Sequence, residues 1–229
     1  MSERQPIVIL ACMVFQELFK RHLPPDLADE VIFFDYGLHR VPGKIASTLQ
    51  MQLDSIKTPS LVVLGYGLCG NGIKGLRSGI HTLLVPRMDD CIAMLLGSRQ
   101  AYKHQFAETP GTYWLSKGWL ESGSHPLKEY QEYVERYGEE EALWLLDQMY
   151  QHYERLALVA HSQEDLERYR PEAQEVARFC QRWGMRYEEV LGSDRFIRRL
   201  IEVAQDLSKA DHEFVVVPPG QEVRTEHFL

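Results

Sequence analysis

Short apolar runs bounded by turn residues recur along this chain. Four lie in the first half, PIVILAC, EVIFFDYG, PSLVVLGYG and GIHTLLVPR, and three in the last third, RLALVAH, MRYEEVLG and EFVVVPPG. Runs of this length are typical of buried β-strands. Apolar residues at helical spacing lie between them, around Phe15, Leu18 and Phe19 and over residues 41–56, 92–106, 165–183 and 194–207. The alternation predicts an α/β fold of parallel strands with helices on both faces.

The strand rhythm is interrupted once, by the segment TPGTYWLSKGWLESGSHP. Its glycine, serine and proline content predicts turns, so we interpret this aromatic loop as a lid or a linker. Two helices separated near Gly138 are expected after it. The predicted division is therefore an N-terminal α/β half at 1–107, the aromatic loop and helical insert at 108–153, and a C-terminal α/β half at 154–229. Two Rossmann-like βαβ halves facing a shared cleft and one continuous domain both fit this pattern.

Composition and charge argue against a membrane protein and against a nucleic-acid-binding protein. A mean hydropathy of −0.30 excludes a membrane-dominated chain. The apolar run near the N-terminus is too short for a signal sequence or a spanning helix, which predicts a cytoplasmic protein with no membrane partner. Lysine and arginine number 25 against 33 aspartates and glutamates, and the resulting net charge of −8 argues against a nucleic-acid partner.

Three of the four cysteines follow predicted strands. Cys12 ends the first apolar run, Cys69 follows the third, and Cys91 follows the fourth. The carboxyl ends of parallel strands meet at one edge of a sheet, where ligands bind, so these thiols should lie together, with His39 from the second run beside them. Cys180 lies within a predicted helix, and we interpret it as a core residue.

Cys69 is surrounded by glycines in the segment GYGLCGNGIKG. The segment is a weak match to a phosphate-binding loop, because it lacks the G-x-x-x-x-G-K-[ST] pattern and its G-x-G-x-x-G match at Gly65, Gly67 and Gly70 has a cysteine inside it. Backbone N–H groups that approach closely can instead stabilise a thiolate or a thiolate-bound cluster. We therefore predict that Gly67, Gly70, Asn71 and Gly72 contact a cofactor.

Four blocks of the sequence together resemble one uncharacterised family: YGLCGNG, PRMDDC followed by IAMLLGS, PGTYWLSKGW, and VVVPPG. They are similar to the family known as domain of unknown function 1638, over nearly the whole chain. The resemblance implies cysteine at the positions of Cys12, Cys69 and Cys91, and it implies no activity. The family more usually has His-Asp-Cys in the second block, where this chain has Asp89, Asp90 and Cys91.

The thiol pattern suggests an open metal site. Structural zinc sites are normally closed by four ligands, often in C-x-x-C pairs, and this chain has no such pair. Three thiolates could hold an iron–sulfur cluster with one iron free, which the soft donors favour. Zn²⁺ held by three thiolates, or by two with His39 or His161, is the alternative. Metal-free thiol chemistry and a purely structural role also stay open.

The favoured hypothesis is a metal-dependent enzyme that acts on a small anionic metabolite in a cleft. Arg87 could bind a substrate carboxylate, and Asp90 and His39 are candidate catalytic groups. A zinc–thiolate enzyme is one alternative. A non-enzymatic carrier or assembly factor for a metal or cofactor, working with a protein partner, is another.

Overall fold

The computed structural model describes residues 4–41 and 43–228, except for the side chains of His39 and Arg40. All seven predicted strands are present, and the α/β class is confirmed. An eighth strand, β5, lies in the aromatic loop. The strands are β1 (Ile7–Cys12), β2 (Glu30–Phe34), β3 (Leu61–Gly65), β4 (Thr82–Pro86), β5 (Thr112–Leu115), β6 (Arg155–Ala160), β7 (Arg186–Leu191) and β8 (Phe214–Val217).

Helices alternate with these strands. They are α1 (Gln16–His22), α2 (Gly43–Ser55), α3 (Cys91–Leu95), α4 (Arg99–Glu108), α5 (Lys117–Glu121), α6 (Pro126–Tyr137), α7 (Glu139–Tyr150), α8 (Gln163–Cys180) and α9 (Arg195–Gln205). The single helix predicted over residues 92–106 is in fact two, because Gly97 has a φ of +87° that ends α3. None of the described helices is both long enough and apolar enough to cross a membrane.

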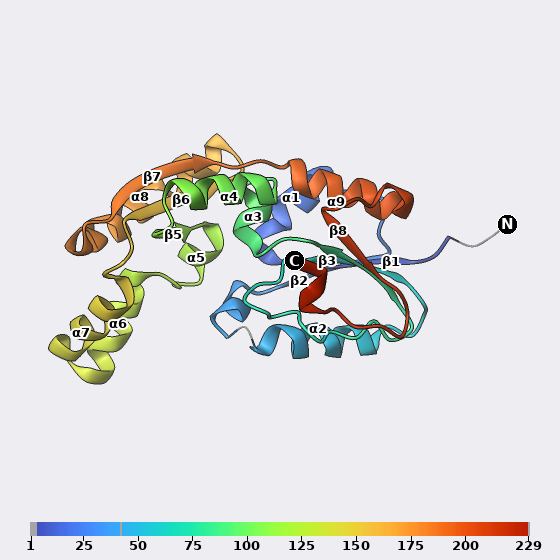
Figure 1. Cartoon of the computed structure of the whole chain (residues 1–229), viewed down its shortest axis with the longest axis horizontal. Helices are drawn as coiled ribbons and strands as arrows, with labels where there is room; N and C mark the ends of the chain where they lie inside the picture. The colour runs from blue at the N-terminus through green and yellow to red at the C-terminus, as the bar shows by residue number, and fades with distance from the viewer. Residues whose placement is uncertain (1–3, 42, 229) are drawn as a thin grey trace. The chain divides into compact units, whose positions relative to one another are not determined.

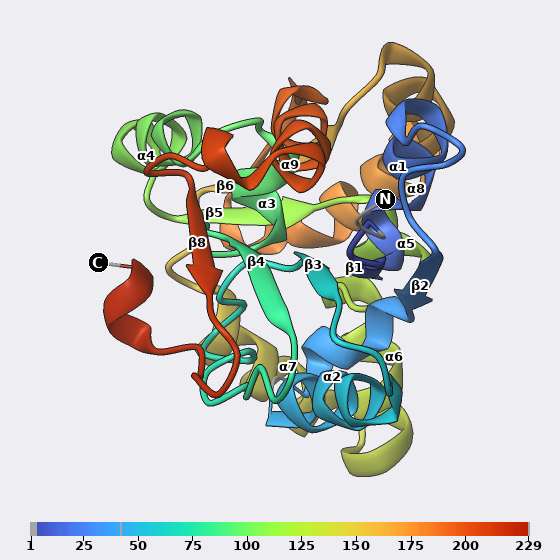
Figure 2. The same cartoon turned by 90° about the vertical axis from the view of Figure 1, so that its right-hand side faces the viewer.

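The described residues up to Arg99, together with those from Asp194 onward, form the first of two compact units. Its sheet has the order β2-β1-β3-β4-β8, in which the first four strands are parallel and β8 is antiparallel to β4. Helix α2 covers one face of this sheet, and α1, α3 and α9 cover the other (Figures 1 and 2). Strands β1 and β3 are buried along their whole length, so they form the centre of this unit.

The second unit spans residues Gln100–Ser193. It contains a parallel sheet of order β5-β6-β7, with α8 packed against β6 and β7 and the hairpin of α6 and α7 beside it (Figure 1). Helix α8 begins where the Ser162 hydroxyl accepts a hydrogen bond from the Asp165 N–H at 3.1 Å. The core of the second unit is rich in aromatic residues and includes Cys180, which is fully buried.

The division into units differs from the predicted one. Residues from Asp194 onward were predicted in the C-terminal half, but β8 pairs with β4 and therefore belongs to the first sheet. The apolar pattern of a strand shows that it is buried and does not show which neighbour it will pair with. The aromatic loop, predicted as turns, contains β5 and α5, and β5 completes the second sheet.

Candidate functional site

The three predicted cysteines meet at one pocket of the first unit. The pocket is lined by Cys12, Asp35, Tyr36, Leu38, Ile45, Tyr66, Cys69 and Cys91. Cys12 ends β1, Cys69 follows β3, and Cys91 is the first residue of α3 after β4. These strands are adjacent and parallel, so their carboxyl ends meet at the same edge of the sheet. We refer to this site as the three-cysteine pocket.

The loops that carry Cys69 and Cys91 lie side by side. The Leu68 N–H donates to Met88 O at 2.8 Å, and the Cys69 N–H donates to Asp89 O at 2.9 Å. A Cβ atom at Gly67 would lie only 2.8 Å from Met88 O, which is closer than packing allows. Glycine at position 67 is therefore what lets the loop after β3 approach the loop after β4.

The backbone at Cys69 is strained. Cys69, Gly70 and Asn71 have φ values of 48°, 63° and 67°, which place three consecutive residues in the left-handed region. Glycine and asparagine adopt this region readily, whereas a cysteine there costs about 1–2 kcal/mol. The turn explains why Gly70 and Asn71 occur here, and it holds Cys69 toward the pocket. Contact of Gly67, Gly70, Asn71 and Gly72 with a cofactor stays a prediction.

The three thiols share one electrostatic environment. Burial raises the pKa of Cys12 to about 11 and that of Cys69 to about 12, and it raises the pKa of Cys91 well above its ordinary value. The charges of Asp90 and Cys12 further raise the pKa of Cys69, and those of Cys69, Asp90 and Cys12 raise the pKa of Cys91. Backbone N–H groups of Val14, beside Cys12, and of Gly67, beside Cys69, act in the opposite direction. At neutral pH the thiols are therefore protonated, until a cation displaces the protons.

Tyr66 and Asp35 also line the pocket. The Tyr66 side chain is only 4% exposed, its hydroxyl has no hydrogen-bond partner among the described residues, and its ring packs against Phe34 with centroids 6.5 Å apart. Asp35 accepts the Gly37 N–H at 2.8 Å, and its charge raises the pKa of both Cys12 and Tyr66. Sequence reasoning did not single out Tyr66, although it lies within the glycine-rich segment directly after a buried strand.

The acidic pair before Cys91 has structural contacts. Asp90 Oδ1 accepts the Ala93 N–H at 3.0 Å and thereby caps α3. Burial raises the pKa of Asp90, while that capping bond lowers it. Asp89 accepts two hydrogen bonds from the Arg99 guanidinium, at 3.2 and 3.3 Å. The carboxylate of Asp90 therefore has a capping role in the fold, and its catalytic role stays a prediction.

The other predicted groups are placed differently. Arg87 follows β4, where its backbone N–H donates to Glu213 O, and it lies outside the described lining of the pocket. His39 lies in the short 3-10 helix after β2, and its side chain is outside the described residues. His161 belongs to the second unit, where its Nε2 is 3.3 Å from an Asp165 carboxylate oxygen.

The donor set fits a soft metal centre by its chemistry, because three thiols converge and neutral thiols become thiolates on metal binding. The three side chains are not, however, in the arrangement of a metal-coordination site. Within the described part of the chain, no group of three histidine, cysteine, aspartate or glutamate side chains is arranged to hold a metal ion. Binding would therefore require the thiols to adjust.

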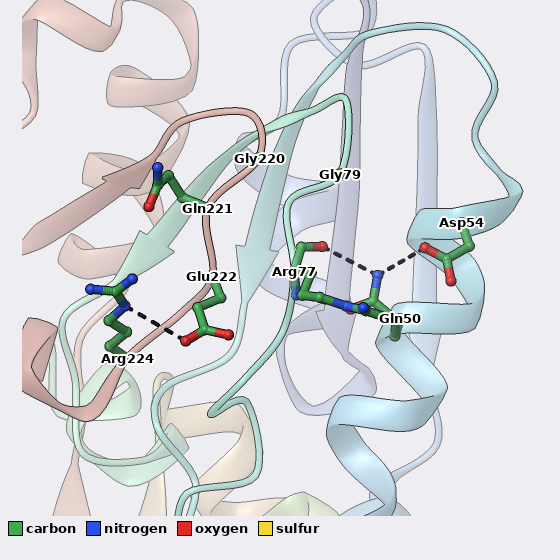
Figure 3. A pocket seen from close by; sticks show the side chains of 8 residues that line it. All are labelled: Gln50, Asp54, Arg77, Gly79, Gly220, Gln221, Glu222 and Arg224. Carbon is green, nitrogen blue, oxygen red and sulfur yellow. Dashed lines mark hydrogen bonds and ion pairs between the residues drawn. The ribbon is translucent and has the colours of Figure 1, made fainter.

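A second pocket of the first unit is lined by residues of α2, residues before β4 and residues after β8 (Figure 3). It is lined by Gln50, Asp54, Arg77, Gly79, Gly220, Gln221, Glu222 and Arg224. The Gln50 amide N–H donates to Asp54 at 2.9 Å and to Arg77 O at 3.2 Å, and Arg224 lies 3.6 Å from Glu222. The side chains are mainly polar, of mixed charge and exposed, which is typical of a solvated surface.

Comparison with known proteins gives a family and no function. The model of the family described as "Protein of unknown function (DUF1638)" matches residues 33–201. This range includes Cys69 and Cys91 and excludes Cys12, so the match is narrower than the predicted resemblance over nearly the whole chain. No curated protein and no solved structure matches the chain.

Proposed function

The chain belongs to the DUF1638 family, and we propose that Cys12, Cys69 and Cys91 bind an iron–sulfur cluster with which the protein acts on a small anionic metabolite. The observation that carries this proposal is the convergence of the three thiols. They come from separate strand ends, far apart in the sequence, and they line one pocket. Cysteines retained only as apolar filler have no reason to meet at the edge where ligands bind.

The charge of the pocket supports a cationic centre. The ionisable groups among its described lining residues are three thiols, two phenols and the Asp35 carboxylate, and none of them is a lysine, arginine or histidine. All of these groups are negatively charged when ionised, so a bound cation stabilises their ionised forms. This lining gives the anionic metabolite itself no support, and a ligand of that charge would have to bind to the metal directly.

Different residues of the chain would hold such a cluster and stabilise its thiolate ligands. Cys12, Cys69 and Cys91 would hold the cluster. Backbone N–H groups of Gly67 and Cys91, which act on the Cys69 thiol, stabilise its thiolate form. Cys12 and Cys91 are each only 8% exposed, so these two thiols are largely shielded from bulk water. A cluster with three protein ligands offers one iron atom with an exchangeable position for a small molecule.

Anaerobic purification, followed by a visible spectrum and analysis for iron, sulfide and zinc, tests the proposal. We expect a broad absorption band near ~400 nm with iron and sulfide retained through gel filtration. The Cys12→Ala, Cys69→Ala and Cys91→Ala variants should each lose most of the iron. Cys180→Ala is the matched control, since it removes a buried free thiol from the second unit and should retain the iron.

Other outcomes would overturn the proposal in distinct ways. Colourless protein with stoichiometric zinc, lost in the same three variants, would replace the cluster with a zinc–thiolate site. Iron that passes to a chelator within minutes would indicate a carrier. Protein that binds neither iron nor zinc after anaerobic reconstitution would show that the three cysteines do not form a metal site.

A further inference from the structure

Tyr66 has a polar group that the fold does not use. Its hydroxyl oxygen is buried and lacks a hydrogen-bond partner among the described residues, although the side chain lines the three-cysteine pocket. A buried hydroxyl without a partner destabilises a fold relative to a hydrogen-bonded one. Phenylalanine would fill the same apolar space beside Phe34 without that cost. Packing alone therefore does not explain why position 66 has a tyrosine and not a phenylalanine.

The position of the side chain suggests an explanation. Tyr66 directly follows β3 and lines the same pocket as the three cysteines. Burial and the charges of Cys12, Cys69 and Cys91 raise its pKa. A centre bound by the three thiols would therefore occupy the pocket that the Tyr66 side chain also lines. Sulfur atoms bound to a metal carry negative charge and accept hydrogen bonds, and such contacts from outside the ligand shell hold a metal centre in place and tune it.

We propose that Tyr66 is a positioning residue for the bound centre, and that its hydroxyl donates a hydrogen bond to a metal-bound sulfur atom in the three-cysteine pocket. This inference rests on the proposed function, because it needs a centre held by the three cysteines. It goes beyond that function by assigning a fourth residue to the site, one that binds no metal. A hydrogen bond to a charged acceptor is worth more than a neutral one, so the loaded protein benefits where the metal-free protein does not.

The test compares Tyr66→Phe with wild type in two states. In the metal-free protein we expect the melting temperature of Tyr66→Phe to be equal to or above that of wild type, since the substitution removes only an unpartnered hydroxyl. After anaerobic reconstitution with ferrous iron and inorganic sulfide, the variant should lose its centre to a chelator about tenfold faster or more. Its reduction potential should fall, because a lost hydrogen bond to sulfur disfavours the more negative, reduced state.

A matched control separates this role from general disturbance of the packing. Tyr169→Phe removes the hydroxyl of a buried tyrosine in the second unit, outside the pocket, and it should leave the chelator rate and the potential unchanged. A Tyr66→Phe protein that retains its centre with wild-type kinetics and potential would overturn the inference while the proposed function stands. Wild-type protein that binds no metal would remove both. A metal-free Tyr66→Phe variant that melts well below wild type would show that the hydroxyl serves the fold instead.

Discussion

Taken singly, Cys180 and the cysteines of the three-cysteine pocket have similar burial and similar pKa values. They differ in whether other thiols lie in the same pocket. Burial raises the pKa of Cys180 to about 12, the same value as for Cys69 and close to that of Cys12. Cys180, however, lies in the aromatic core of the second unit, whereas the pocket cysteines line one pocket, where the charges of Cys69 and Cys12 raise the pKa of Cys91. Burial and a raised pKa therefore do not mark a functional thiol. What distinguishes the pocket cysteines from Cys180 is that three thiols line one pocket.

The largest effect on stability that sharpens this comparison is expected from Cys180→Ser. This substitution places a hydroxyl in a core where the replaced side chain is fully buried. A buried hydroxyl without a partner costs about 1–3 kcal/mol, so the free energy of unfolding should fall by that amount. Urea denaturation of the metal-free protein measures it, and the metal content of the folded variant should equal that of wild type.

Cys180→Ala provides the control for that measurement. Alanine removes the sulfur without adding a polar group, so it should cost less stability than serine at the same position. If Cys180→Ser instead lost the metal while it stayed folded, Cys180 would belong to the site, and the contrast between the two regions would fail.

A smaller effect concerns pH. The pKa of Cys12 is about 11 in the folded protein, against an ordinary value of 9.0, so the folded state holds this proton more tightly than the unfolded state. The stability that this preference contributes is complete below pH 9 and is lost as the pH rises through 11. Between pH 7 and pH 10, wild type should lose about 1 kcal/mol more stability than Cys12→Ala.

Chemical denaturation of the two metal-free proteins at several pH values measures this difference. Groups far from Cys12 are common to both proteins and cancel in the comparison, whereas the pKa values of Cys69 and Cys91, which Cys12 raises, shift in the variant. A difference that stays constant from pH 7 to pH 10 would show that the Cys12 thiol keeps its ordinary pKa and lies in a more polar environment than the fold indicates.

Much of this account could be predicted from the sequence. The seven apolar runs became strands, and the meeting of Cys12, Cys69 and Cys91 followed from one geometric rule for parallel strands. The rule works because it depends only on each cysteine being just past the end of a strand. It does not require knowledge of how the side chains pack.

What the sequence did not predict depends on long-range pairing. Strand β8 joins the first sheet through β4, more than a hundred residues earlier, and no local pattern encodes that choice. Strand β5 has only four residues, among glycine, serine and proline that indicate turns. Tyr66 was overlooked because a tyrosine after a buried strand is usually part of the core, and only the unpartnered hydroxyl distinguishes it.

The central claim is that the three pocket cysteines are close enough to bind one centre, and a trivalent arsenical tests it without assuming a metal. Such a reagent bonds to two or three neighbouring thiolates at once, and it has much lower affinity for a lone thiol. Wild type and Cys180→Ala should each bind about one arsenical per chain tightly, and the Cys12→Ala, Cys69→Ala, Cys91→Ala triple variant should bind none. Equal binding by wild type and the triple variant would contradict the claim.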